Sequence, residues 1–294
     1  TTGLKIDERL ALRDDVEILT IPDAQRKDAT VKAEYINSAD VVFLCLPDAA
    51  SKESVSLLKP DNTRTRFLDA STAHRTNPDW VYGLPELNPG HRERVRTAQK
   101  VAVPGCHASG FIMLMHPLVA AGIVPADYPA TTYSITGYSG GGKEMIASYE
   151  DAGELGDAMR SPRFYALGLA HKHLPEMQTL TGLANTPLFT PIVGNFAQGM
   201  VVAVPLLPRL LTRPVAAADL QHYFAEYYAG ETFIKVMPAD ATPLLDNGFL
   251  PATECNDTNR AEIFVFGHGD QILLAARFDN LGKGASGAAI QCMN

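Results

Sequence analysis

The chain has 294 residues, of which 46% are hydrophobic and 20% charged, a composition typical of a soluble globular protein with one large domain or two. Its net charge of -8 argues against a nucleic-acid or membrane-surface partner, and no apolar run reaches the ~18 residues that span a bilayer. The four cysteines (Cys45, Cys106, Cys255 and Cys292) have neither CxxC nor other short spacing. We therefore expect no metal site, no disulfide framework, and a reducing, cytoplasmic compartment.

The first third of the sequence alternates between helical and strand patterns. Residues 5–14 have helical character, residues 16–21 predict a short strand, and the apolar run 41–46 is typical of a parallel strand buried on both faces. Further strands are expected at 66–69 and 100–103. These repeated units predict a doubly wound parallel sheet of the Rossmann type, whose ligands bind at the carboxyl ends of the strands.

The turns after these strands are therefore candidate ligand sites: residues 46–48, residues 70–75 and Cys106. We expect Asp48 to cap a helix over 49–58. The chain opens Thr1-Thr2-Gly3 and runs directly into a helix, so we expect the first strand and most of its glycine turn to be missing. Arg26 lies where the 2′-phosphate of NADP would bind, which predicts NADP(H), although a nearby aspartate leaves NAD open.

From about residue 108 the pattern changes to strands mixed with longer irregular stretches, which predicts an α+β unit with a mixed sheet. The expected elements are strands 131–136, 201–207 and 234–237, a hairpin of 263–266 with 272–276, and a helix over 216–228. Small residues at helical spacing over 280–291 predict a last helix that packs closely against another backbone.

A glycine-rich loop, Gly137–Lys143, follows the strand 131–136. Glu144 stands where a phosphate-binding P-loop has Ser or Thr, so that motif is not met. We interpret the loop as a nest of backbone amides beside Lys143, suited to a carboxylate, a phosphate or a nicotinamide edge. A flexible hairpin tip is the alternative.

Cys106 and a later histidine pair are the residues with the clearest chemistry. Cys106 lies between a strand end and a helix start, where unpaired amides and the helix dipole favour the thiolate. The alternative is a small buried cysteine without chemistry. His171 and His173, in the segment that ends at Glu176, are acid–base candidates because imidazole titrates near neutrality. A metal site there is disfavoured, because HxxxH spacing is absent.

Motifs along essentially the whole chain resemble one family. They are Pro104-Gly-Cys106, Ser139-Gly-Gly-Gly-Lys143, His171-x-His-x-Pro-Glu176 and residues 279–289, together with residues 69–75 and 83–87. In this order they resemble the short (type 2) N-acetyl-γ-glutamyl-phosphate reductases of the semialdehyde dehydrogenase superfamily. The chain departs from the family in the missing first strand and in His107, where tyrosine is common.

The resemblance implies a reaction and a site. Cys106 would attack the acyl phosphate of N-acetyl-L-glutamyl 5-phosphate, releasing inorganic phosphate. The thioester would be reduced with NADPH to N-acetyl-L-glutamate 5-semialdehyde, in arginine biosynthesis, with His171 handling the proton. Substrate-binding residues would be Lys143, His173, Glu176, Arg75 and Arg163. Cofactor-binding residues would be Thr1, Thr2, Gly3, Arg26, Cys45, Pro47, Ser71, Ser139, Gly140, Asn280 and Lys283.

The same resemblance implies two domains and a homo-oligomer, either dimer or tetramer. Residues 1–105 with 279–294 would form the dinucleotide-binding domain, and residues 106–278 the catalytic and oligomerisation domain. Three alternatives remain open: a reductase of another acyl phosphate (aspartyl or aminoadipyl), a cysteine hydrolase or acyltransferase without a dinucleotide, and a non-catalytic binding protein.

Overall fold

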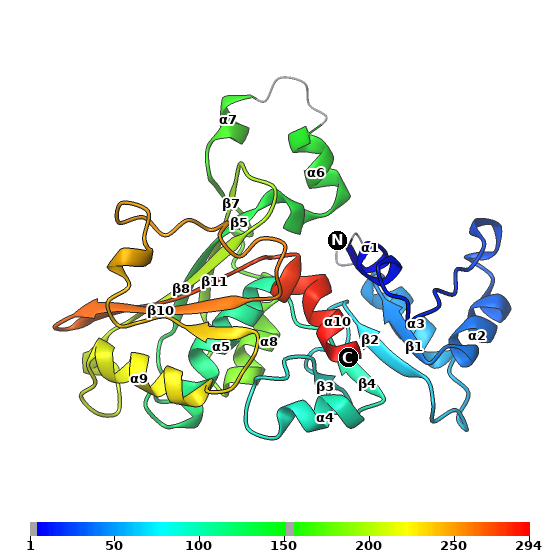
Figure 1. The fold of residues 1–294 in the computed structure, drawn as a ribbon, viewed down its shortest axis with the longest axis horizontal. Helices are drawn as coiled ribbons and strands as arrows, with labels where there is room; N and C mark the ends of the chain where they lie inside the picture. The colour runs from blue at the N-terminus through cyan, green and yellow to red at the C-terminus, as the bar shows by residue number, and fades with distance from the viewer. Residues whose placement is uncertain (1–4, 151–155) are drawn as a thin grey trace.

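The computed structural model describes residues 5–150 and 156–294, which form two sheets on opposite sides of the molecule (Figure 1). The smaller sheet is parallel, with the strand order β1-β2-β4-β3. Its strands are β1 (Val41–Leu44), β2 (Arg66–Asp69), β3 (Val81–Tyr82) and β4 (Lys100–Ala102), and its helices are α1 (Ile6–Ala11), α2 (Ala29–Ser38), α3 (Asp48–Ser56) and α4 (His91–Thr97). The predicted doubly wound parallel sheet is confirmed.

Three details of this sheet differ from the prediction. Residues 16–21 are not a strand: no described strand pairs with them, and a strand needs a neighbour for its backbone N–H and C=O groups. β1 is half-buried rather than buried on both faces, because it lies at the edge of the described sheet. Asp48 is the first residue of α3, not its cap, and its carboxylate accepts hydrogen bonds from Thr72 instead.

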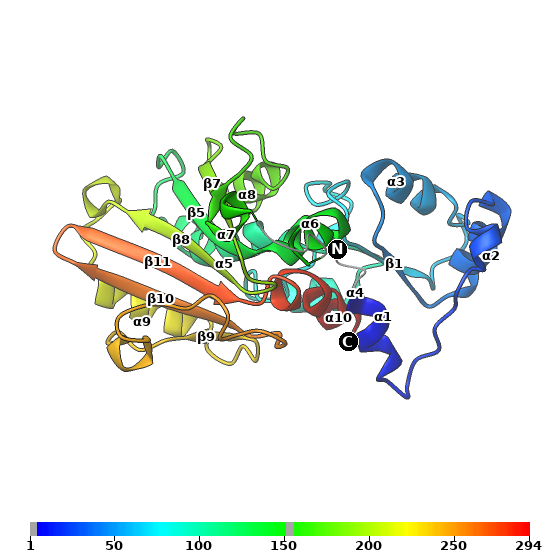
Figure 2. The ribbon, with the colours of Figure 1, turned by 90° about the horizontal axis from the view of Figure 1, so that it is seen from above.

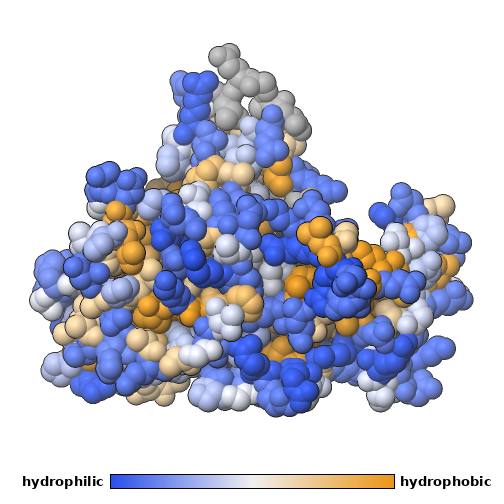
Figure 3. All heavy atoms as spheres, viewed as in Figure 1, coloured by the Kyte–Doolittle hydropathy of each residue, from blue (hydrophilic) through white to orange (hydrophobic). Residues whose placement is uncertain are grey.

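The surface near α1 contains exposed apolar side chains. Figure 3 shows hydrophilic residues over most of the visible face, with an apolar patch over α1, where Leu12 is 89% exposed. Ile18 and Leu19, a few residues further along, are exposed as well. The stretch after α1 therefore adds apolar surface without extending the sheet. No helix of the described residues is long and apolar enough to cross a membrane.

The larger sheet is mixed, with the strand order β6-β7-β5-β8-β11-β10-β9. Its strands are β5 (Thr131–Gly137), β6 (Arg163–Phe164), β7 (Leu188–Gly194), β8 (Met200–Leu206), β9 (Ile234–Val236), β10 (Ala261–His268) and β11 (Gln271–Phe278). The largest apolar core lies between this sheet and the helices α5 (Cys106–Ala120), α8 (Leu174–Thr181) and α9 (Ala217–Tyr227). The predicted mixed sheet is confirmed, and β10 with β11 is the predicted hairpin.

Of two segments between the sheets, one excludes the alternative considered for it and the other differs from its predicted form. The glycine-rich loop is not a hairpin tip: a 3₁₀ turn leads into α6 (Lys143–Glu150), which with α7 (Asp157–Arg160) forms a projecting arm (Figure 1). The predicted helix 280–291 is a π-helical turn, Gly282–Ser286, followed by α10 (Gly287–Met293). Seen from above, α10 lies between the parallel sheet and the β10–β11 hairpin (Figure 2), and it packs into the core of the parallel sheet.

Candidate active site

Cys106 lies where the two sheets meet. β4 ends at Ala102, and a three-residue turn leads to α5, whose first residue is Cys106 and whose N-cap is Gly105. A side chain at Gly105 would collide with His173 Nε2 and with the Arg75 guanidinium. The glycine thus lets the histidine and the arginine approach the backbone directly before the cysteine.

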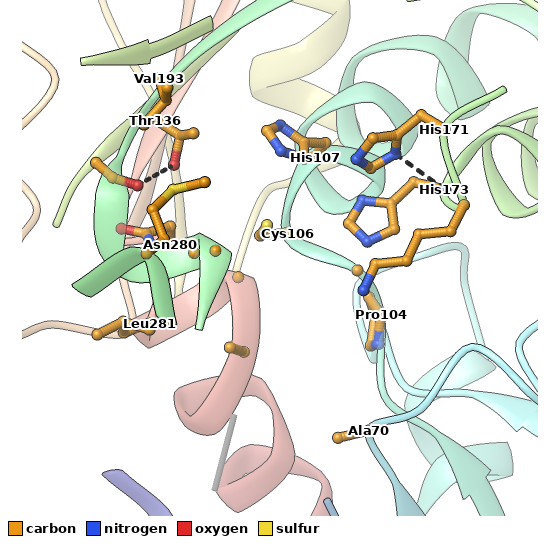
Figure 4. A pocket seen from close by; sticks show the side chains of 18 of the residues that line it. Ala70, Pro104, Cys106, His107, Thr136, His171, His173, Val193, Asn280 and Leu281 are labelled. Atoms are coloured by element: carbon orange, nitrogen blue, oxygen red, sulfur yellow. Dashed lines mark hydrogen bonds between the residues drawn. The ribbon is translucent and has the colours of Figure 1, made fainter. Parts of the chain in front are cut away.

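The thiol opens into a cavity of about 280 Å³ (Figure 4). Residues from both sheets line it, among them Ala70, Arg75, Cys106, His107, Thr136, Tyr165, His171, Lys172, His173 and Asn280. Figure 4 shows the imidazole rings of His107, His171 and His173 together on one side of the cysteine. The structure therefore brings together the cysteine and the two histidines that the sequence singled out.

The charge state of Cys106 differs from the expectation. The side chain is half-buried, and burial raises the pKa of its thiol to about 11. The backbone N–H of His107 and the Arg75 guanidinium act in the opposite direction without outweighing burial. The prediction of a resting thiolate is wrong, because desolvation exceeds the effect of the helix N-terminus. The thiol therefore keeps its proton at neutral pH.

His171 and His173 lie on the loop before α8. The backbone N–H of His173 donates to His171 Nδ1 at 3.1 Å, so a neutral His171 ring carries its proton on Nε2. Burial, with Lys172 and Arg75 nearby, lowers the pKa of His171 to about 4, which makes the ring neutral at pH 7. His173 is buried, which holds its pKa well below the usual value, and its ring lies 4.6 Å from that of His171.

Glu176 lies behind the nucleophile rather than in the cavity. Its carboxylate is 1% exposed and accepts hydrogen bonds from Arg75 Nη1 (2.7 Å), Tyr82 Oη (2.7 Å) and the Gly105 backbone N–H (3.2 Å). Arg75 also donates to backbone oxygens of the two neighbouring turns, Val103 O and Ala70 O. The pair thus joins α8 to the turns that follow β2 and β4. Both oxygens of Glu176 thus accept hydrogen bonds from the protein, and the residue does not line the cavity.

A second cavity, of about 180 Å³, adjoins the first, and both are lined by Ala70, Arg75 and Lys172. It lies at the carboxyl ends of β1 and β2, where a parallel sheet binds dinucleotides. The predicted residues Cys45, Pro47 and Ser71 line it, together with Leu46, Asp48 and Thr72. On the other side of the first cavity, Gly140 and Asn280 line the wall, and Asn280 Nδ2 donates to the buried Ser139 Oγ at 3.0 Å.

Four of the predicted cations lie outside both cavities. Lys143 is exposed at the start of α6, and Arg163 donates to Tyr149 Oη at 2.7 Å. Arg26 is exposed and forms an ion pair with a neighbouring aspartate, so nothing in its position marks a phosphate site. Lys283 is fully buried, with Nζ 2.8 Å from both carboxylate oxygens of Glu86, and ties the C-terminal segment to the loop after β3.

Sequence reasoning gave no role in the site to His107, Tyr165 and Lys172, which are among the residues that line the first cavity. Lys172 lies between the two predicted histidines and lines both cavities, so its position was a usable signal. Tyr165 comes from the strand-like stretch at β6 and gave no signal, because only the tertiary fold brings it to the cysteine. The predicted Thr1, Thr2 and Gly3 lie outside the described residues.

Comparisons with known proteins match the whole length of the chain. A family model described as semialdehyde dehydrogenase, NAD binding domain, matches residues 9–95, and one described as semialdehyde dehydrogenase, dimerisation domain, matches residues 106–280. A protein named N-acetyl-gamma-glutamyl-phosphate reductase 2 from Nostoc sp. is 47% identical over 300 residues, covering 100% of this chain and 92% of its own. N-acetyl-gamma-glutamyl-phosphate reductase from Brucella ovis is 46% identical over 296 residues, covering 100% and 94%.

The chain belongs to the N-acetyl-γ-glutamyl-phosphate reductase family. Members of this family are oxidoreductases, which confirms the predicted enzyme class, and the NAD binding domain confirms the nicotinamide cofactor, NADP(H). A hydrolase or acyltransferase without a dinucleotide does not fit that domain.

Solved structures show the same fold. Aspartate semialdehyde dehydrogenase from Francisella tularensis has a TM-score of 0.67 at 14% identity and covers 100% of this chain and 96% of its own. Aspartate semialdehyde dehydrogenase II from Vibrio cholerae, complexed with ASA, has a TM-score of 0.65 at 15% identity and covers 96% and 84%. These likenesses are of the fold alone.

Proposed function

We propose that this reductase converts N-acetyl-L-glutamyl 5-phosphate into N-acetyl-L-glutamate 5-semialdehyde and inorganic phosphate, with NADPH and through a thioester on Cys106, in arginine biosynthesis. The observation that carries the proposal is the juxtaposition of the Cys106 thiol with His171 in a cavity that continues into the groove at the end of the parallel strands. The substrate itself is taken from the named relatives.

The residues at the second cavity fit a nicotinamide cofactor. Its position at the carboxyl ends of β1 and β2, its polar Ser71 and Thr72, and the lining residues that it shares with the cavity of Cys106 suit the nicotinamide half of a dinucleotide. Cys45, Pro47 and Ser71 would hold that half, with Gly140 and Asn280 on the far wall. When bound there, the cofactor supplies the hydride that reduces the acyl carbon.

Cys106 performs the first step. Its sulfur forms a bond to the acyl carbon, and the bond from that carbon to the phosphate oxygen breaks. The phosphate group of the bound acyl phosphate dianion leaves as HPO₄²⁻ and takes the thiol proton with it, so the step is balanced without a resting thiolate. The product is a thioester, a better hydride acceptor than a carboxylate, which divides one difficult reduction into two easier steps.

His171 serves the oxygen on the acyl carbon. Its ring is neutral with the proton on Nε2, and Nε2–H can donate to the oxygen of the tetrahedral thiohemiacetal. The collapse of that species breaks the C–S bond, releases the aldehyde and returns the sulfur as a thiolate, which regains a proton from water. The free amides in the first turn of α5 can bind the same oxygen.

Arg75 and Lys172 are the cations at the junction of the two cavities, and we propose that they attract the phosphate or the carboxylate of the substrate. His173 would line the substrate space, while Glu176 acts through Arg75. We also propose the domain division of residues 1–105 with 279–294 and 106–278, a homo-oligomeric assembly, and a cytoplasmic location. The match of residues 106–280 to a dimerisation domain supports the assembly.

The test is NADPH oxidation with N-acetyl-L-glutamyl 5-phosphate by the Cys106→Ser variant. We expect no turnover and unchanged NADPH binding, because a serine hydroxyl is a much poorer nucleophile than a thiol at neutral pH. Binding can be followed by quenching of Trp80, the only tryptophan. Cys255→Ser, outside both cavities, is the control. Substantial turnover by Cys106→Ser would exclude the thioester route.

A further inference from the structure

A buried histidine beside the nucleophile has no role in the function proposed above. His107 follows Cys106 on α5 and is 3% exposed. Its Nδ1 lies 2.6 Å from Ser134 Oγ, and its Nε2 lies 2.7 Å from Tyr165 Oη. Burial lowers the pKa of His107 to about 3, so the ring is neutral, with one donor and one acceptor nitrogen.

Ser134 determines which nitrogen of His107 carries the proton. Ser134 lies on β5 and is 0% exposed, and within the described residues the hydroxyl has a hydrogen-bond partner only in His107 Nδ1. A proton on Nδ1 would leave the buried Ser134 O–H without an acceptor, which is the costly arrangement. Ser134 therefore donates to Nδ1, and the proton of His107 is on Nε2.

This direction of the hydrogen bonds leaves the Tyr165 proton free for the cavity. Nε2–H of His107 donates to Tyr165 Oη, so the phenol O–H must find a different acceptor. Tyr165 lines the cavity in front of Cys106, and its ring lies 6.1 Å from that of His171. Burial raises the pKa of Tyr165, which keeps it a phenol and thus a donor.

We propose that Tyr165 is a further catalytic residue, whose O–H donates a hydrogen bond to the acyl oxygen on the carbon that Cys106 attacks. His107 and Ser134 are positioning residues that keep this O–H directed into the cavity. The bond stabilises the negative charge that develops on the acyl oxygen as the S–C bond forms, and no proton is transferred by Tyr165. The inference rests on the proposed function only for the role of Cys106 as nucleophile.

The test uses the full chain without cofactor and with 4-nitrophenyl acetate, whose acyl group Cys106 takes up with release of 4-nitrophenolate. Tyr165→Phe should lower the rate of this burst by about 10²-fold, the usual cost of losing one oxyanion donor. Alkylation of Cys106 by iodoacetamide forms no oxyanion, so its rate should not change. Tyr133→Phe, on the exposed face of β5, should leave both rates at the wild-type value.

The outcomes separate this inference from the proposed function. A burst that persists in Cys106→Ala would contradict the nucleophile assignment itself. A burst that depends on Cys106 but is unchanged in Tyr165→Phe would overturn the role of Tyr165 alone. Equal slowing of acylation and alkylation in Tyr165→Phe would also overturn it, because the effect would then be on the thiol and not on the acyl oxygen.

The positioning role has its own readout. Because His107 acts through Tyr165, His107→Phe should slow acylation in the wild type but have no further effect in Tyr165→Phe. His107→Gln, whose amide can donate to Tyr165 Oη, should recover most of the rate. Ser134→Ala, a smaller change, should slow acylation less, because the His107 proton is then free to occupy either nitrogen. Fully multiplicative effects of His107→Phe and Tyr165→Phe would overturn the coupling.

Discussion

The Glu176→Gln variant tests whether the buried carboxylate supports the nucleophile turn. Glu176 and Arg75 form an ion pair at 2.7 Å, with side chains 1% and 8% exposed. Removing one member of a buried pair leaves the other charge uncompensated and costs about 3–5 kcal/mol. Glutamine keeps the size of the side chain and one acceptor oxygen, so we expect a loss near the lower end, about 3 kcal/mol of the free energy of unfolding.

Urea unfolding followed by far-ultraviolet circular dichroism measures that loss, with Glu144→Gln on the exposed start of α6 as the matched control. The control should change stability by less than about 0.5 kcal/mol. Reductase activity should fall as well, because Arg75 and the Gly105 N–H bond to different oxygens of Glu176, and glutamine keeps only one of the two. A loss in Glu176→Gln no larger than in the control would refute the assignment of Glu176 as the support of this turn.

Three further changes follow from the site. His171→Asn should lower kcat by about 10²–10⁴-fold, measured by NADPH oxidation, and a larger loss in His173→Asn would reverse the assignment within the pair. Burial raises the pKa of the Cys106 thiol to about 11. The rate of Cys106 alkylation by iodoacetamide in the ligand-free protein should therefore rise about tenfold per pH unit from about pH 7 to about pH 10. A rate that reaches a plateau near pH 8 would contradict this pKa. Gly284→Ala would place a β-carbon 2.8 Å from Cys106 Cβ, so it should lower the free energy of unfolding in urea by about 1–3 kcal/mol and slow turnover. Gly168→Ala, whose β-carbon would meet no atom within 4 Å, should do neither. Equal effects of the two substitutions would show that the close approach of Gly284 to Cys106 is unimportant.

Local patterns predicted the parts of the site that depend on sequence neighbours. Cys106 could be placed because a strand, a tight turn and a helix follow one another within a few residues. The His171 and His173 pair could be placed because both lie in one short segment. In each case the structure brings the predicted side chains into the same cavity.

Residues whose position depends on tertiary contacts could not be placed from local patterns. Lys283 was expected at the cofactor, but a buried lysine requires a partner, and Glu86 from a segment nearly 200 residues earlier provides it. Glu176 was expected at the substrate, but it lies outside the cavity lining and accepts hydrogen bonds from Arg75 and two further donors. The predicted resting charge of Cys106 was wrong because the sequence shows the helix start, which favours the thiolate, but does not show the burial, which favours the thiol.

The central claim is tested most directly in the oxidative direction, by phosphate-dependent reduction of NADP with N-acetyl-L-glutamate 5-semialdehyde and, separately, with aspartate semialdehyde. The account predicts turnover with the first aldehyde only, none without phosphate, and none in Cys106→Ser. Turnover with aspartate semialdehyde instead would contradict the proposed substrate. Turnover that does not require phosphate would contradict the acyl-phosphate chemistry at Cys106.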